Sequence, residues 1–169
     1  MMIRRCSLVM GAMCVLLAGV GVSPARADDR ADVKALEQRL VAALSAKDVD
    51  RIMACYAPEE SLVVFDVIPP RQYVGAKAFR KDTEDFLAGF PGPVKFESSD
   101  LAITADGRLA FAHYILHVTG TDRAGKQDEY NLRVTDCLRK TKGKWLIVHE
   151  HLSVPVDVTS GKADLLSKP

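Results

Sequence analysis

Apolar positions along this chain follow two different spacings. In the first half, Val33, Leu36 and Leu40 recur at steps of three and four residues, which predicts an amphipathic helix over residues 29–46. Asp48, a typical N-cap residue, predicts a short second helix directly after it. Residues 62–67 have the pattern of a short strand, and a third helix is expected over residues 76–90.

From residue 94 onward, apolar and polar residues alternate. The alternation predicts strands over residues 94–105, 109–121, 127–140 and 144–156, separated by turns that contain glycine. Helices first and antiparallel strands last are the order of an α+β domain. We therefore expect one domain over residues 28–156, followed by a loose polar tail over residues 157–169.

The first 27 residues have the pattern of a signal peptide that is cleaved after Ala27. Arg4 and Arg5 precede an apolar run over residues 8–22, and residues 25–27 have the small-x-small pattern of a cleavage site. The run is short for a membrane span, so we expect an exported, periplasmic or secreted chain without a membrane anchor.

Charge narrows the choice of partners. Loss of Arg4, Arg5 and Arg26 with the signal peptide reduces the 23 basic residues to 20, against 22 acidic ones. No basic run remains after residue 27, which argues against nucleic acid as a partner.

Four segments of the chain resemble the NTF2-like superfamily, which includes SnoaL-like proteins and ketosteroid isomerases. They are residues 47–56, residues 66–80, the turn at residues 119–122 and the strand at residues 143–155. The last segment is also similar to the calcium/calmodulin kinase association domain. The resemblance implies a cone in which N-terminal helices pack on a curved antiparallel sheet. It leaves the activity open, because this fold hosts enzymes, ligand-binding proteins and assembly modules.

Two aspartates are the candidate catalytic residues. Asp66 precedes a proline-rich loop, and the resemblance implies the role of the general base of ketosteroid isomerases. Asp136 lies in a segment similar to the isomerase strand that carries a second, protonated Asp, and an apolar cavity would keep such a carboxyl neutral and able to donate. Alternatively, Asp66 bonds only backbone amides and Asp136 forms a cross-strand salt bridge. Leu40 stands where the isomerases have their oxyanion Tyr, which argues against steroid isomerisation.

The register of the last hairpin decides which residues face the helices. If residues 141–143 form a three-residue loop with a Gly bulge, Lys140 pairs with Lys144. By the resemblance, Asp136 and Glu150 then lie on the concave, helix-covered face. The outer face is expected to carry Arg133, Thr135, Cys137, Trp145, Ile147, His149 and His151. A slip of one residue would mix the two sets.

This register makes a disulfide between Cys55 and Cys137 unfavourable, although an oxidising compartment permits one. The exposed Trp145 and Ile147 would need cover, which favours a homodimer. His149 and His151 share a face, with His113 expected across the intervening strand. No Cys or carboxylate completes a ligand set, so we expect no metal and no other cofactor.

Tyr56, Tyr73 and Phe86 complete the candidate ligand-binding residues with Glu150, although each aromatic residue also suits an ordinary core position. The sequence thus predicts an apolar, carboxylate-lined cavity that binds a small organic molecule, with or without acid–base turnover of the isomerase or lyase type. The alternative is a non-catalytic oligomerisation module that uses the outer sheet face.

Overall fold

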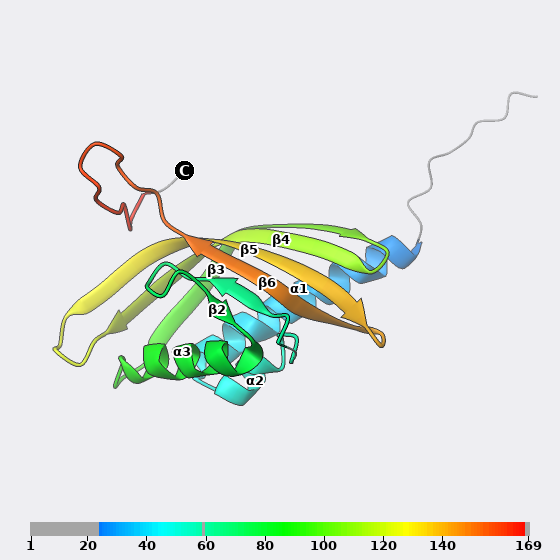
Figure 1. The fold of residues 1–169 in the computed structure, drawn as a ribbon, viewed down its shortest axis with the longest axis horizontal. Coiled ribbons are helices and arrows are strands. Elements are labelled where there is room, and N and C mark those ends of the chain that lie inside the picture. The colour runs from blue at the N-terminus through cyan, green and yellow to red at the C-terminus, as the bar shows by residue number, and fades with distance from the viewer. Residues whose placement is uncertain (1–23, 59, 168–169) are drawn as a thin grey trace, which may run out of the picture.

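The computed structural model describes residues 24–58 and 60–167, which form three helices and one six-stranded sheet (Figure 1). The helices are α1 (Pro24–Ser45), α2 (Val49–Met53) and α3 (Ala76–Ala88). The strands are β1 (Val63–Phe65), β2 (Tyr73–Val74), β3 (Val94–Asp106), β4 (Leu109–Thr121), β5 (Gln127–Thr141) and β6 (Lys144–Ser153). The predicted α+β class is confirmed. The predicted signal peptide falls mostly outside the described residues and stays a prediction.

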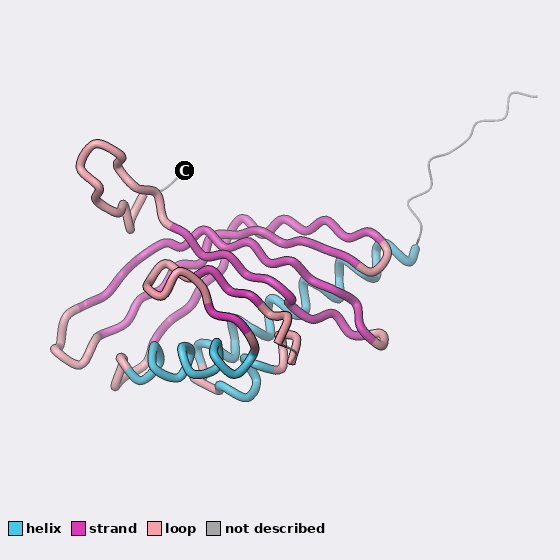
Figure 2. Tube along the Cα trace, viewed as in Figure 1, coloured by secondary structure: helices cyan, strands magenta, loops and turns pink. Residues whose placement is uncertain are grey.

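The strands follow the order β2-β1-β6-β5-β4-β3 in the sheet. The long strands β3 to β6 form the predicted antiparallel meander. The short strand β1 pairs with β6 in parallel and with β2 in antiparallel orientation. The two-residue strand β2 was not predicted. Figure 2 shows the three helices on one side of the sheet, and no helix of the described chain covers the other side.

The core lies between this inner sheet face and the helices. The predicted apolar stripe of α1 is confirmed, because Val33, Leu36 and Leu40 are all buried in it. Asp48 is the N-cap of α2, and its side chain accepts a hydrogen bond of 3.0 Å from the amide of Arg51. The buried stripe holds α1 against the inner sheet face, and the cap defines the start of α2.

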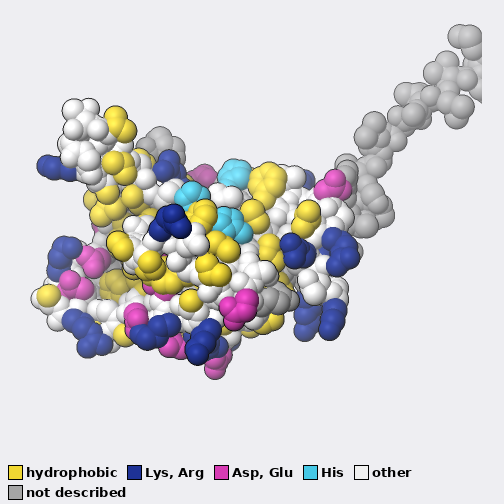
Figure 3. All heavy atoms as spheres, in the orientation of Figure 1, with side chains coloured by type: hydrophobic (Ala, Val, Ile, Leu, Met, Phe, Trp, Pro, Cys, Tyr) yellow, Lys and Arg dark blue, Asp and Glu magenta, His cyan; other side chains and the backbone are white. Residues whose placement is uncertain are grey.

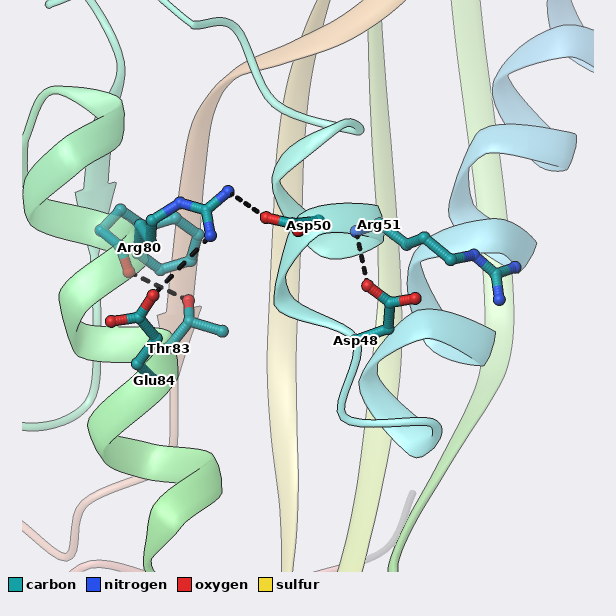
Figure 4. A network of polar contacts seen from close by, with 7 residues as sticks. Asp48, Asp50, Arg51, Arg80, Thr83 and Glu84 are labelled. Atoms are coloured by element: carbon teal, nitrogen blue, oxygen red, sulfur yellow. Dashed lines mark hydrogen bonds and ion pairs between the residues drawn. The ribbon is translucent and has the colours of Figure 1, made fainter.

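An external ion pair joins α2 to α3 (Figure 4). The Arg80 guanidinium of α3 lies 2.8 Å from Asp50 of α2 and 3.7 Å from Glu84 of its own helix. The Asp50 side chain is largely exposed and that of Glu84 is about half exposed. The guanidinium group of Arg80 thus forms its ion pairs on the surface and not between the helices and the sheet.

The turn of the last hairpin differs from the prediction. Lys140 pairs with Trp145, not with Lys144, and the loop has only two residues, Lys142 and Gly143. Both have positive φ, 50° and 80°, as a type I′ turn requires. The predicted three-residue loop is therefore wrong.

A β-bulge in β6 corrects the predicted faces. Ile147 and His149 pair with adjacent residues of β5, so Val148 between them has no partner. Trp145 and Ile147 are 5% and 0% exposed and lie on the inner face, not on the outer face as predicted. Beyond the bulge the alternation is shifted by one residue, and Glu150 also faces inward.

The outer face retains the predicted histidines. Figure 3 shows histidine side chains beside hydrophobic ones on the visible surface. Phe65 of β1 packs edge-on against His149 and His151, with ring centroids 5.0 and 5.6 Å apart. Cys137 and Cys55 are both free thiols, in agreement with the expectation that they do not pair.

The chain after β6 projects from the sheet (Figure 1). A bridge between Val156 and Ala163 closes it on itself, and the Asn131 amide donates to the carbonyl of Leu165 at 2.8 Å. The side chain of Val158 is 95% exposed. Val156, Leu165 and Leu166 of the tail are also exposed.

Candidate active site

A cavity of about 90 Å³ lies between the helices and the inner sheet face. Side chains from all three helices and from strands β3 to β6 line it. The apolar lining residues are Leu40, Leu44, Ile52, Phe79, Phe86, Phe96, Leu116, Val118, Leu132, Val134 and Leu152. The polar ones are Tyr56, Asp66, Thr83, Tyr114 and Glu150. The cavity thus has apolar walls with a few carboxyl and hydroxyl groups.

Asp66 marks the more exposed end of the cavity. It follows directly on β1, and its Oδ1 accepts a hydrogen bond of 2.5 Å from the amide of Val67. Burial raises the pKa of Asp66 to about 6, further raised by Asp82 of α3 and held back by the Val67 amide. A carboxyl with this pKa is mostly ionised at pH 7 and can still accept a proton.

Glu150 marks the buried end. It is 5% exposed, and the hydroxyl of Tyr56 donates to its Oε2 at 2.5 Å. Burial, followed by the charge of Asp136, raises the pKa of Glu150 well above its ordinary value, although the Tyr56 hydrogen bond opposes this shift. Burial therefore favours the neutral acid form of Glu150.

Two more carboxyls lie behind Glu150. Asp136 has no exposed surface, and its Oδ2 accepts a hydrogen bond of 3.3 Å from the hydroxyl of Tyr114. Burial, then the charge of Glu37, raises the pKa of Asp136 well above its usual range. Glu37 of α1 is 2% exposed, and burial followed by the charge of Glu150 raises its pKa to about 8.

Neither oxygen of Glu37 nor Oδ1 of Asp136 has a hydrogen-bond donor among the described residues. Carboxylate oxygens cannot donate to one another, but Glu37 and Asp136 lie within reach of a hydrogen bond once one of them is protonated. We call Glu37, Asp136 and Glu150 the carboxyl cluster. Because three adjacent buried charges would repel strongly, the cluster holds protons at neutral pH.

A model of the SnoaL-like domain family matches residues 33–157. The chain belongs to this family. None of the curated proteins matches the chain. Among solved structures, an NTF2-like protein of unknown function from Pseudomonas putida is 30% identical, covers 85% of this chain and 98% of its own, and has a TM-score of 0.76.

Two further structures extend the likeness of this SnoaL-like protein to the wider NTF2-like superfamily. A candidate calcium/calmodulin dependent protein kinase II association domain from Xanthomonas campestris is 25% identical over 75% of this chain and 87% of its own, with a TM-score of 0.64. An NTF2-like superfamily protein from Salmonella enterica is 16% identical over 82% and 99%, with a TM-score of 0.71, which supports the fold alone. The predicted NTF2-like cone is confirmed.

The structure of the SnoaL-like domain brings four of the predicted site residues to one cavity. Asp66, Glu150, Tyr56 and Phe86 all line it. The backbone bond to Val67, which the sequence offered as the alternative role of Asp66, is also present. The Val67 amide occupies one carboxylate oxygen, and Asp66 also interacts with the Ile68 amide and with the carboxyl of Asp82.

Two predicted residues lie outside the lining. Asp136 sits behind Tyr114 and makes no salt bridge with a residue of the described chain. Tyr73 of β2 lies beside the cavity, where its hydroxyl is 3.4 Å from the carbonyl oxygen of Pro69 and also interacts with Asp82. Leu40 lines the cavity, so the hydroxyl groups come from elsewhere.

Three polar residues of the site were missed in the sequence: Thr83, Tyr114 and Glu37. Tyr114 lines the cavity from β4 and gives it a second hydroxyl group. Glu37 lies four residues after Val33 and three before Leu40, so helical spacing already places it on the buried stripe of α1. An acidic residue in an apolar stripe was the available signal.

The histidines do not form a metal centre. Among the described residues, no group of three or more His, Cys, Asp or Glu side chains is arranged to hold a metal ion. Nδ1 of His149 instead donates to the carbonyl of Val63 at 2.7 Å.

No described helix is long and apolar enough to span a bilayer.

Proposed function

We propose that this SnoaL-like protein binds a small organic molecule in the cavity and catalyses proton transfer on it, as an isomerase or lyase that needs no cofactor. The observation that carries the proposal is the placing of Asp66 and Glu150 in one apolar cavity. Asp66 can accept a proton, while Glu150 can donate a hydrogen bond. A base and a neutral acid in one dry cavity suit a carbonyl compound.

In this mechanism the Asp66 carboxylate takes a proton from the carbon beside the carbonyl group. Negative charge then develops on the carbonyl oxygen, where Glu150 and the Tyr114 hydroxyl donate hydrogen bonds. The Tyr114 hydroxyl donates to Oδ2 of Asp136 before the ligand enters, so it must redirect this hydrogen bond to the carbonyl oxygen of the ligand. Return of the proton from Asp66 to another carbon of the ligand completes an isomerisation.

The cavity volume limits the ligand. About 90 Å³ is far below the roughly 300–1,000 Å³ of pockets for drug-sized molecules. The bound molecule therefore has only a few heavy atoms unless Phe86 and the loop after Asp66 move. This size argues against a steroid and favours a small ketone.

Exchange of carbon-bound hydrogen tests the proposal directly. We expect the protein to accelerate deuterium uptake by 2-butanone in D₂O, as followed by proton NMR, and Asp66→Asn to abolish the acceleration. Glu97→Gln, on an exposed part of β3, is the matched control and should exchange like the unmodified protein. Exchange at the buffer rate, with ligand shifts still present, would leave a binding protein and refute the catalytic role.

A second proposal is self-association through the outer sheet face. Phe65 and Phe111 are 37% and 45% exposed there, and the name of the Xanthomonas relative describes an association domain. We expect Phe111→Lys to convert a dimer into a monomer in light scattering, whereas Lys95→Gln should not. A substitution at Trp145 would not test this interface, because Trp145 is part of the core.

We also propose that the chain is exported and cleaved after Ala27, on the pattern of residues 1–27. Sequencing the N-terminus of the mature protein would decide this, since Asp28 should be the first residue.

A further inference from the structure

Carboxyl groups dominate the polar surroundings of the cavity. Glu150 and Asp66 line it, and Asp82 lies next to Asp66, close enough for a shared hydrogen bond. Asp136 and Glu37 lie directly behind Glu150. Five carboxyls thus surround a cavity of about 90 Å³.

No basic side chain balances them. None of the lining residues is Lys, Arg or His, and no such residue is among the main causes of the pKa shifts of Glu37, Asp136 and Glu150. Arg80, on the neighbouring helix α3, is bound outside the cavity by Asp50 and Glu84. Buried carboxyls normally have a positive partner or a full set of donors, and Glu37 has neither among the described residues.

The walls of the cavity suit an organic cation. Five aromatic rings line it, from Tyr56, Phe79, Phe86, Phe96 and Tyr114. Aromatic faces attract ammonium groups, especially where water is excluded. A metal ion fits less well, since no described group of residues has the arrangement to hold one.

We propose that the ligand of this cavity carries a positive charge and is a small protonated amine. The proposal rests on the proposed function, since it names the chemical class of the molecule bound at that site. The ammonium group pairs with Glu150, the member of the carboxyl cluster that lines the cavity, and the aromatic rings contact its alkyl part. A ligand with both an ammonium and a carbonyl group would also serve the proposed proton transfer.

Binding of the amine releases a proton. A positive charge beside the carboxyl cluster favours its ionised form, so one carboxyl loses its proton when the cation enters. The titratable groups that face the cavity or the cluster are Glu37 from α1, Cys55 and Tyr56 after α2, Asp66 after β1, Asp82 from α3, Tyr114 from β4, Asp136 from β5 and Glu150 from β6. Affinity should therefore increase from pH 6 to pH 8, by up to about tenfold per pH unit for one released proton.

Calorimetric titration of the full mature chain with 1-propylamine, 1-propanol and 2-butanone tests this inference. These probes are similar in size, but only the amine is charged. We expect the amine to bind on the order of tenfold more tightly than the alcohol at pH 8. In buffers of different ionisation enthalpy, the amine should release a proton and the alcohol should not.

Variants distinguish the cluster from the rest of the cavity. Glu37→Gln keeps the shape of the side chain and removes its charge, so it should reduce the advantage of the amine and the proton release without changing propanol binding. Glu97→Gln should change neither. Asp136→Asn provides a second test on another strand in case one variant folds poorly.

Each result of the titration has a definite meaning. Equal affinity for propylamine and propanol, or binding without proton release, would overturn the cation proposal and show that protons alone fill the cluster. Binding of 2-butanone in that case would still support the proposed function. If none of the three probes binds, both proposals fail.

Discussion

The β5–β6 hairpin carries ionisable side chains on both of its faces, and these side chains differ in burial and in hydrogen-bond partners between the two faces. On the outer face, His151 is exposed and His149 is held by the carbonyl of Val63. On the inner face, Asp136 and Glu150 are buried with Glu37. Among the described residues, none of these three carboxyls forms an ion pair with a Lys, Arg or His side chain.

A comparison with the surface carboxylates shows why the inner set is unusual. Asp50, Glu97 and Asp128 each lie 2.8 Å from an Arg or Lys side chain. Such exposed pairs contribute only about 0–1 kcal/mol each. The buried carboxyls have no such pairing and oppose folding when ionised. Their burial is therefore better explained by binding or catalysis than by stability.

Removal of the β-bulge should have the largest effect, because the bulge determines which side chains of β6 lie on the inner face. Deletion of Val148 would put either Glu150 or the pair Trp145 and Ile147 on the wrong face. We expect the free energy of unfolding to decrease by at least about 3 kcal/mol, because two large side chains lose their burial. Urea denaturation measures this loss. Val148→Ala keeps the residue count and should cost about 1 kcal/mol or less; an equal loss in both variants would contradict the role of the bulge.

The same bulge marks the limit of prediction from the sequence. Alternation located β3 to β6 within a few residues, and the Asp48 cap was identified correctly. Alternation cannot reveal one extra residue in a strand, since the register depends on how Trp145 and Ile147 pack against α1, far away in the sequence. Glu150 was nevertheless placed on the inner face, because the shorter turn and the bulge each shift the pairing by one residue in the same direction, and a total shift of two residues preserves the alternation.

The site was predictable to a similar extent. Asp66 and Glu150 could be named from local pattern and resemblance, and both line the cavity. Glu37 could be placed on a buried stripe, but its neighbours come from β5 and β6, about a hundred residues later. The carboxyl cluster therefore emerges only from the tertiary structure.

A change of pH should have the second largest effect, because it alters the stability contribution of the buried carboxyls. The folded pKa of Glu37, about 8, is above its ordinary value of 4.5, so the folded state binds the proton more tightly than the unfolded state. Its contribution to stability is greatest below pH 4.5 and is lost as pH increases toward 8. Glu37→Gln should thus increase the free energy of unfolding at pH 8 by about 1–3 kcal/mol more than at pH 5.

Urea denaturation at the two pH values measures this difference, with Glu97→Gln as the exposed control. The shifts of Asp136 and Glu150 have the same direction and should leave part of the pH dependence in the Glu37 variant. A stability gain that is the same at pH 5 and pH 8 would mean that Glu37 is not kept neutral by burial.

The smallest effect is expected on the outer face. His151 is exposed and its ring packs edge-on against Phe65 with centroids 5.6 Å apart, so His151→Gln should change the free energy of unfolding by about 0.5 kcal/mol or less at both pH values. The measurement should be made at low protein concentration, where a dimer dissociates. A larger change that appears only at high concentration would mean that a second copy covers the outer face. The outer histidines would then be buried in the dimer, as the inner carboxyls are buried in each monomer. The difference in burial between the two faces would hold for the monomer alone.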